Sequence, residues 1–251
     1  MADPVRIALL YPAVLGTYGD GGNAVVLAER LRWRGIAAES ISVDIDQPLP
    51  LEADLYVLGG GEDSAQTLAT SRLADGRLRR AVERGAVTFA VCAGFQILGE
   101  SFLDGAGGVY PGLGILDCRT DRLDGSRAVG ELLVEPSVSG LDLLTGYENH
   151  GGRTVLGPAA APLGTVRVGT GNGAGDVDGA LQGNVVATYL HGPALARNPA
   201  LADHLLAKVV GPLQPVDDAE AEELRRERIH AVRSQSPLRR RRQWRPPARD
   251  R

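Results

Sequence analysis

Two residues in this sequence, Cys92 and His191, are of the types that carry out nucleophilic catalysis. Cys92 stands in AVTFAVCAGFQIL, between an apolar run and a turn that contains glycine, and His191 ends the apolar run NVVATYLHG. A thiol with an ordinary pKa near about 8.5 is mostly protonated at neutral pH, so it needs a nearby imidazole or a helix N-terminus to become an effective nucleophile. The residue types therefore predict a cysteine nucleophile with a histidine as its base.

Short apolar segments alternate with segments of helical periodicity over the first hundred residues. The periodic segments end at Gly35 and Gly85, and glycine is a common helix stop. Strands joined by helices of this length form a parallel sheet with helices on both faces. We therefore predict strands at 5–12, 36–44, 53–61, 86–91 and 184–192, and helices at 24–35, 71–85, 94–102, 199–211 and 217–234.

Beyond about residue 103 the sequence becomes rich in turns. The segments AVGELLVEP (128–136) and TVRVGTGNG (165–173) are typical of antiparallel strands. The predicted fold class is therefore α/β, with a mainly parallel central sheet, helices on both faces and some antiparallel strands. Active sites of such sheets lie at the carboxyl ends of the strands, where we expect Cys92, His191, the glycines at 59–61 and the loop at 16–23.

Cys92 and His191 each also have a structural interpretation. A buried cysteine usually serves as a small apolar residue, and a single histidine is more often a hydrogen-bonded polar residue than a catalyst. Their coincidence at strand ends favours catalysis, because a strand that ends in Cys92 and turns through Gly94 into a helix presents the thiol at the helix N-terminus. Cys118 follows no such turn and is predicted to be structural.

The net charge of −4 is unevenly distributed over the 251 residues. Eleven arginines and only two acidic residues lie between Arg225 and Arg251, so the rest of the chain is acidic. We predict one domain over residues 1–233 and a disordered basic tail over 234–251, solvated rather than bound to nucleic acid or anionic lipid. The two cysteines, and the absence of a signal-like or membrane-spanning apolar run, predict a cytoplasmic protein without a transmembrane segment.

Several segments resemble one protein family. VCAGFQILGESF is similar to the Cys-x-Gly-x-Gln nucleophile elbow of class I glutamine amidotransferases, and YLHGP resembles the histidine-bearing strand end of their cobyric-acid-synthase-like (CobB/CobQ-like) branch. Within this branch, four further segments resemble the GatD family, the glutaminase subunits of lipid II isoglutaminyl synthases, and occur in the same order. They are YPAVLGTYGDGGN, LGGGEDSAQ, GYENHGGRT and TYLHGPALARNP. The resemblance covers about residues 5–230 and implies the class I glutamine amidotransferase fold.

The resemblance implies a catalytic role for four residues. The Cys92 thiolate would attack the side-chain amide of L-glutamine, and the backbone N–H groups of Gly60 and Ala93 would hold the oxyanion. His191 would protonate the leaving ammonia and then activate the water that hydrolyses the thioester.

Substrate-binding roles are expected for Gln96, Arg127 and Gly60. Gln96 is predicted to line the glutamine pocket, although it is also an ordinary helical residue. Arg127 is predicted to bind the α-carboxylate, because a planar bidentate donor suits that group, although a solvated arginine fits the sequence nearly as well. No metal-ligand spacing, P-loop or dinucleotide motif is present, so no metal or cofactor is predicted in this chain, and ATP and Mg²⁺ are expected on a partner subunit.

One position departs from the wider family pattern. Many members carry a carboxylate two residues after the catalytic histidine, where this chain has Pro193. In the GatD family the third residue is thought to come from the partner, a MurT-like Mur ligase homologue, so this chain alone is expected to be a poor glutaminase. Other carboxylates are available in the chain but none is fixed by spacing, namely Glu148, Asp176 and Asp178.

Two further segments are given lesser roles. The loop at 16–23 is interpreted as support for the sheet edge or for a subunit contact, and His150 is a weaker alternative to His191. The predicted function is a glutaminase subunit of a heterodimer, whose ammonia a MurT-like ATP-dependent ligase uses to amidate the D-glutamate of lipid II in peptidoglycan synthesis. Two alternatives stay open: hydrolysis that serves another acceptor such as a cobyrinate, and a non-catalytic α/β binding subunit in which Cys92 is structural.

Overall fold

The computed structural model describes residues 3–235 of the chain. Its central sheet has six strands in the order β13-β14-β4-β3-β1-β2, and only the β13–β14 pair is antiparallel. The strands are β1 (Val5–Leu10), β2 (Ala38–Val43), β3 (Leu55–Leu58), β4 (Val87–Val91), β13 (Ala180–Gln182) and β14 (Val185–Thr188). The predicted α/β class with a mainly parallel sheet is confirmed.

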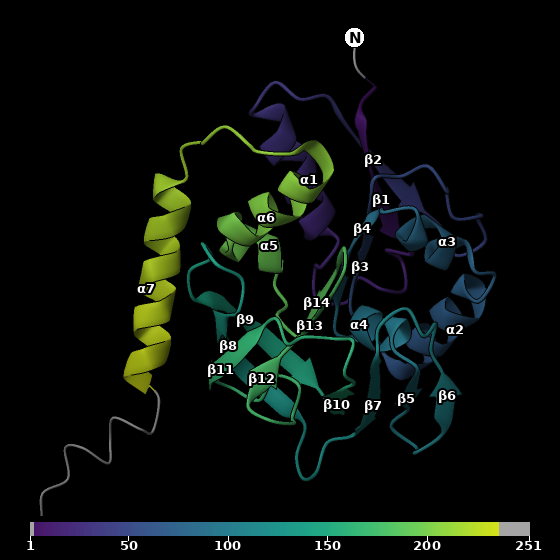
Figure 1. The fold of residues 1–251 in the computed structure, drawn as a ribbon. Coiled ribbons are helices and arrows are strands. Elements are labelled where there is room, and N and C mark those ends of the chain that lie inside the picture. The colour runs from purple at the N-terminus through teal and green to yellow at the C-terminus, as the bar shows by residue number, and fades with distance from the viewer. Residues whose placement is uncertain (1–2, 236–251) are drawn as a thin grey trace, which may run out of the picture.

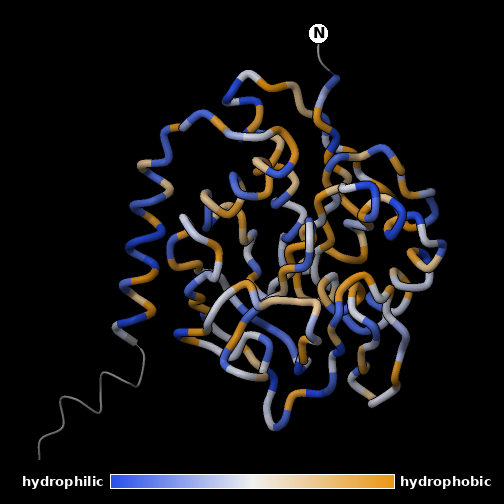
Figure 2. The backbone as a smooth tube through the Cα atoms, in the orientation of Figure 1, coloured by the Kyte–Doolittle hydropathy of each residue, from blue (hydrophilic) through white to orange (hydrophobic). Residues whose placement is uncertain are grey.

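Helices cover both faces of the central sheet. Figure 1 shows α1 (Gly22–Arg32), α5 (Ala194–Arg197) and α6 (Pro199–Val210) on one side, and α2 (Asp63–Leu73), α3 (Arg77–Glu83) and α4 (Ala93–Leu98) on the other. Every residue of β3, β4 and β14 is buried, as a sheet covered on both faces requires. Figure 2 shows hydrophobic segments at the centre of the molecule and a largely hydrophilic α7 (Ala219–Gln235) at its edge.

Two smaller sheets lie beyond the carboxyl ends of the parallel strands, below the central sheet in Figure 1. One has the order β10-β7-β5-β6 and the other the order β12-β11-β8-β9. The antiparallel pairing of β8 with β11 agrees with the prediction for these two segments. The strands are β5 (Ser101–Leu103), β6 (Val109–Pro111), β7 (Cys118–Arg122), β8 (Ala128–Pro136), β9 (Leu144–His150), β10 (Gly152–Leu156), β11 (Gly164–Val168) and β12 (Val177–Asp178).

Two helix predictions are wrong in their limits. In place of one helix at 71–85 the structure has α2 and α3, because Gly76 adopts a left-handed backbone conformation (φ 76°) that interrupts the helix. The Arg77 N–H, at the start of α3, donates to the Asp75 side chain at 2.8 Å. The helix predicted at 94–102 ends at Leu98, and residues 101–103 instead pair with β6 and β7. In both cases local backbone conformation or strand pairing overrides the helical periodicity.

The helix α7 ends at Gln235, two residues beyond the predicted domain limit at 233. The rest of the predicted tail, residues 236–251, lies outside the described part of the chain. Within residues 3–235, no helix combines the length and the apolar character that crossing a membrane would need.

A buried arginine ties α1 to the C-terminal part of the chain. Arg30 is 2% exposed, and its guanidinium donates two hydrogen bonds of 2.7 Å to Asp203 in α6 and two of 2.7 and 2.8 Å to Asp218 before α7. Burial opposes the charged form, but the hydrogen bonds to both carboxylates outweigh it and raise the pKa of Arg30. This cluster holds α1 in place, and the loop that precedes α1 belongs to the site described below.

Removing the Arg30 cation should destabilise the fold strongly. Arg30→Met leaves Asp218 without its cationic partner and Asp203 paired only with Arg34, so we expect a loss of on the order of 3 kcal/mol in the free energy of unfolding, measured by urea denaturation. Arg32→Met is the matched control, because the Arg32 side chain is 47% exposed and pairs only at the surface with Glu29. It should cost less than about 1 kcal/mol, and an equal loss in both variants would contradict the prediction.

Candidate active site

Cys92 lies at the junction between β4 and α4, in a strained conformation. Its φ and ψ are 51° and −105°, which non-glycine residues rarely adopt, and its side chain is largely buried. The turn needs Gly94, because a Cβ at this position would lie 2.7 Å from the Cβ of Leu58 in β3. The Gly94 N–H in turn donates to the Gly59 carbonyl at 3.1 Å. The strand, turn and helix therefore form the elbow expected around a nucleophile.

His191 follows β14 and approaches Cys92 from the next strand of the sheet. Its backbone forms an isolated bridge with Tyr147 of β9, with the His191 N–H donating to the Tyr147 carbonyl at 2.7 Å. The side chains of His191 and Cys92 meet beside Gly60: a Cβ on Gly60 would lie 2.6 Å from His191 Cε1 and 3.4 Å from Cys92 Cβ. The structure thus brings together the two residues that the sequence singled out.

Asp20 is a third member of this cluster, and its position in the sequence does not single it out. This residue lies in the loop between β1 and α1, is fully buried, and its Oδ2 is 2.9 Å from His191 Nδ1. Burial of the ring opposes its charged form, but the hydrogen bond to Asp20 and the interaction with Cys92 outweigh burial and raise the pKa of His191 to about 10. The ring is therefore a cation at neutral pH, suited to stabilise a Cys92 thiolate and to donate a proton. The signal that could have indicated Asp20 is its place in the loop that follows the predicted strand at 5–12, at the same sheet edge as Cys92 and His191.

The carboxylates considered from the sequence have other partners. Glu148 accepts backbone N–H groups of Thr170 and Gly171 at 2.7 and 2.9 Å. Asp178 accepts the Thr188 hydroxyl at 2.5 Å, and burial raises its pKa to about 6. For Asp176, at φ 50°, no hydrogen bond to His191 is found. Within residues 3–235, Asp20 is the carboxylate that hydrogen-bonds His191.

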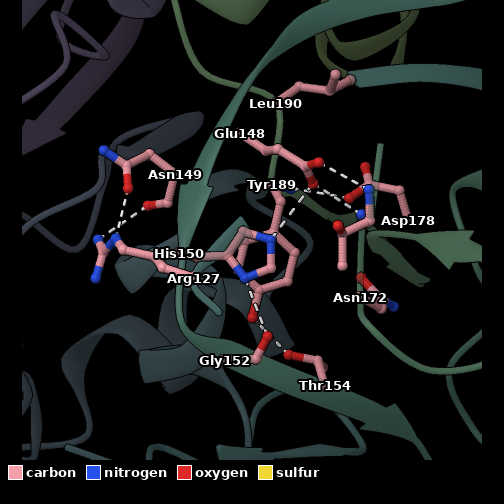
Figure 3. A network of polar contacts seen from close by, with 12 residues as sticks. Arg127, Glu148, Asn149, His150, Gly152, Thr154, Asn172, Asp178, Tyr189 and Leu190 are labelled. Atoms are coloured by element: carbon pink, nitrogen blue, oxygen red, sulfur yellow. Dashed lines mark hydrogen bonds and ion pairs between the residues drawn. The ribbon is translucent and has the colours of Figure 1, made fainter. Parts of the chain in front are cut away.

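His150, the weaker alternative to His191, belongs to the same network as Glu148 (Figure 3). Its Nδ1 is 3.0 Å from the Gly152 carbonyl and its Nε2 is 3.5 Å from a Glu148 oxygen. Its ring stacks on Tyr189, with 3.8 Å between the ring centroids. Both nitrogens thus face groups other than Cys92, which favours a structural role for His150 in the wall of the site.

A cavity of about 280 Å³ opens in front of Cys92, at the small end of the range for ligand pockets. It is bounded by the start of α4, by the turn between β3 and α2, and by three loops of the smaller sheets. Four of the predicted site residues line it: Cys92, Ala93, Gln96 and Arg127. The other residues of the wall with ionisable side chains are Asp63, Asp104, Arg122 and His150.

The predicted oxyanion donors differ in their surroundings. Ala93 lines the cavity directly after the nucleophile, and within the described chain its N–H makes no hydrogen bond. The Gly60 N–H instead donates to Asp20 Oδ2 at 2.9 Å, and Gly60 is not part of the cavity wall. Gly60 would have to leave this carboxylate to bind an oxyanion or a substrate, so both roles stay predictions. Gly61 lines the cavity and is a second candidate donor.

Gln96 is anchored rather than solvated. Its Oε1 accepts a hydrogen bond from Gln66 Nε2 at 3.0 Å, and its Nε2 donates to the Tyr189 hydroxyl at 3.0 Å. The Tyr189 hydroxyl continues to Thr154 at 2.6 Å, and burial raises its pKa. Gln96 thus presents a fixed amide to the cavity.

Arg127 is exposed at the rim of the cavity and is oriented by Asn149 (Figure 3). Its Nε donates to Asn149 Oδ1 at 2.5 Å and its Nη2 donates to the Asn149 carbonyl at 3.1 Å. The Asn149 amide donates to the Tyr18 hydroxyl at 2.8 Å, and the Tyr18 ring lies 4.6 Å from that of His191. The guanidinium is therefore held at the rim by Asn149, and Asn149 connects it through Tyr18 to His191.

Cys118 lies in β7 and is buried, and burial raises the pKa of its thiol to about 12. This environment suits the structural role predicted for it. In the described part of the chain, no group of three or more His, Cys, Asp or Glu residues is arranged to hold a metal ion.

Comparisons with known proteins agree on one family. The model of the CobB/CobQ-like glutamine amidotransferase domain matches residues 6–199. The chain is 35% identical over 217 residues to the lipid II isoglutaminyl synthase (glutamine-hydrolyzing) subunit GatD of Staphylococcus aureus, covering 83% of this chain and 87% of that protein. It is also 35% identical over 179 residues to cobyric acid synthase of Sphingopyxis alaskensis, covering 68% of this chain and 35% of that protein.

The fold is also similar to that of PurLQS from Thermotoga maritima, with a TM-score of 0.58, 18% identity, and coverage of 83% of this chain and 96% of that one. Family, fold and the Cys92 elbow agree with the resemblance seen in the sequence. The chain therefore belongs to the CobB/CobQ-like family of glutamine amidotransferases, in its GatD branch.

Proposed function

We propose that this chain hydrolyses L-glutamine through a thioester on Cys92 and supplies the ammonia to a ligase. The observation that carries the proposal is the strained Cys92 elbow, at the floor of a cavity, beside a buried cationic histidine. A structural cysteine would have no need of this backbone strain, which disfavours the non-catalytic alternative.

The chemistry follows from these groups. The Cys92 thiolate attacks the amide carbon of glutamine, and the N–H of Ala93 binds the oxyanion that forms. The carbon–nitrogen bond breaks as His191 gives its proton to the nitrogen, which leaves as ammonia. Neutral His191 then removes a proton from water as the water attacks the thioester. Collapse of this adduct breaks the carbon–sulfur bond and releases glutamate and the Cys92 thiolate, which restores the thiolate–imidazolium pair.

The proposed acceptor is the D-glutamate of lipid II. Support comes from the similarity to GatD, which extends over most of that protein, whereas the match to cobyric acid synthase covers about a third of it. On this proposal a MurT-like partner binds ATP and Mg²⁺ and activates the D-glutamate carboxylate, and the two subunits form a heterodimer. The free thiols of Cys92 and Cys118 fit a reducing compartment, so we place the reaction in the cytoplasm, at the membrane face that carries the lipid-linked substrate.

Reconstitution tests this function. The chain is co-expressed with a MurT-like subunit, and lipid II amidation is followed by mass spectrometry with ATP and either glutamine or ammonium chloride as the nitrogen source. We expect the complex to amidate lipid II with either nitrogen source. When this chain is omitted, we expect amidation with ammonium chloride but not with glutamine. Glutamine hydrolysis without lipid II amidation would leave the glutaminase in place and refute the acceptor, and a cobyrinate substrate is then the next to be assayed.

Arg127 should act on substrate binding. Arg127→Lys keeps the positive charge but loses the fork of donors that Asn149 orients, so we expect KM for glutamine to rise about tenfold with kcat changed less than about threefold. Steady-state glutaminase kinetics check this. Arg122→Lys, a second arginine of the same wall, is the comparison. A larger KM effect at Arg122 than at Arg127 would reassign the carboxylate contact.

A further inference from the structure

On the basis of the proposed glutaminase function, we propose that Asp20 is the positioning residue of His191, so that nucleophile, base and orienting carboxylate all belong to this one chain. This assignment differs from the expectation that a partner subunit supplies the third residue. The loop at 16–23 then holds part of the catalytic centre rather than only a sheet edge or a subunit contact.

The hydrogen bond between Asp20 and His191 fixes which ring nitrogen keeps its proton when the ring is neutral. Asp20 Oδ2 is an acceptor, so at 2.9 Å from it Nδ1 must donate. The other nitrogen, Nε2, is buried and has no hydrogen-bond partner among the described residues. Nε2 is therefore the atom left to exchange protons with Cys92 and the substrate, as the chemistry requires.

The same oxygen of Asp20 also holds the glycine turn after β3. It accepts the Gly60 N–H at 2.9 Å as well as His191 Nδ1, and this turn delivers Gly61 to the cavity wall. One carboxylate therefore sets both the imidazole and the backbone that faces the reacting carbonyl.

The environment of Asp20 suits a negative charge. The residue immediately precedes the N-terminal end of α1, where the helix dipole stabilises an anion. The second carboxylate oxygen of Asp20, Oδ1, is buried and has no hydrogen-bond partner in the described residues. Among those residues, the cationic group that pairs with the Asp20 carboxylate is the imidazolium of His191. The titratable groups that the described structure places against His191 are Asp20 and Tyr18, from the loop before α1, and Cys92, from the start of α4.

The test is Asp20→Asn in the full chain, assayed alone and in complex with the MurT-like subunit. An asparagine amide facing Nδ1 would donate rather than accept and would favour the wrong tautomer, so we expect kcat for glutamine hydrolysis to fall at least about 100-fold with KM changed less than about threefold. Without the carboxylate His191 loses its proton at lower pH, so the midpoint for alkylation of Cys92 by iodoacetamide should move at least about one unit higher.

Asn23→Ala is the control for lost structure. Asn23 lies in α1, is equally buried, and accepts the Leu195 N–H at 2.9 Å without touching His191. This variant should lower the unfolding midpoint but keep the alkylation profile and kcat within about threefold of wild type.

Three results would overturn the assignment of Asp20. The first is that Asp20→Asn leaves both kcat and the alkylation profile unchanged. The second is that Asn23→Ala shifts the alkylation midpoint as much as Asp20→Asn does. The third is that adding the partner restores wild-type kcat to Asp20→Asn, which would mean that the partner supplies the carboxylate. Absence of glutamine hydrolysis in the wild-type complex is a separate outcome that refutes the proposed function itself.

Discussion

Replacing Cys92 by alanine should lower glutamine-dependent amidation at least about 10⁴-fold while amidation from ammonium chloride continues. The thiolate forms the covalent intermediate, and no other described nucleophile lines the cavity beside Ala93. The ligase needs only ammonia, so its own chemistry is expected to survive. The measurement is lipid II amidation by the reconstituted complex with each nitrogen source, together with glutamate release.

Cys118→Ala is the matched control, because it removes the other buried thiol. Burial raises the pKa of Cys118 to about 12, so this thiol is protonated at neutral pH and should not react with a glutamine-analogue electrophile. We expect one adduct in wild type and in Cys118→Ala, and none in Cys92→Ala. Glutamine-dependent amidation that persists in Cys92→Ala would reject the thioester mechanism.

A single methyl group at Gly60 should disable the site almost as thoroughly. The added Cβ would lie 2.6 Å from His191 Cε1 and 3.2 Å from Asp20 Oδ2, well inside van der Waals contact with the ring edge. Asp20 fixes the ring through its hydrogen bond to Nδ1, so relief of this clash must displace the imidazole or break that hydrogen bond. A displacement near 1 Å costs about 100-fold in rate, and we expect kcat for Gly60→Ala to fall by that factor or more.

Gly21→Ala tests whether the effect is specific. A Cβ on Gly21 would meet only Leu9 Cδ2, at 3.3 Å, and a leucine methyl can give way by a few tenths of an ångström. We expect near wild-type kinetics and stability for Gly21→Ala. Thermal unfolding of Gly60→Ala distinguishes a displaced histidine from a misfolded chain. We expect a cooperative transition in this variant, because the added methyl group lies beside His191 and Asp20, which are outside the hydrophobic core. Wild-type kcat in Gly60→Ala would show that His191 is not held where the structure has it.

The sequence was sufficient for the architecture and for the expectation that Cys92 and His191 lie at the same sheet edge, because both depend on local patterns. Apolar runs that end at Cys92 and near His191 predict strands, and strands separated by helices predict a parallel sheet whose carboxyl ends coincide. The predicted limits of these helices were wrong because helical periodicity contains neither the left-handed turn at Gly76 nor the strand pairing of residues 101–103.

Asp20 was missed for a different reason. It is separated from His191 by 171 residues, whereas the family pattern places a carboxylate two residues after the histidine, where this chain has Pro193. The relevant information was topological: the loop after β1, like Cys92 and His191, lies at a strand end of the same sheet edge. Spacing within the sequence cannot rank carboxylates that meet only in the folded sheet, and the hydrogen-bond partners of Glu148 and Asp178 were equally inaccessible.

The strand order has a consequence for how the protein acquires activity as it folds. Asp20 follows β1, Cys92 follows β4 and His191 follows β14, so the three groups meet only after β14 has paired with β4 near the end of the chain. Contacts of such long sequence separation form slowly, because the entropy of closing a long loop must be overcome first. Glutaminase activity should therefore return later than helical structure during refolding, and a nascent chain that lacks β14 would carry the Cys92 elbow without its base.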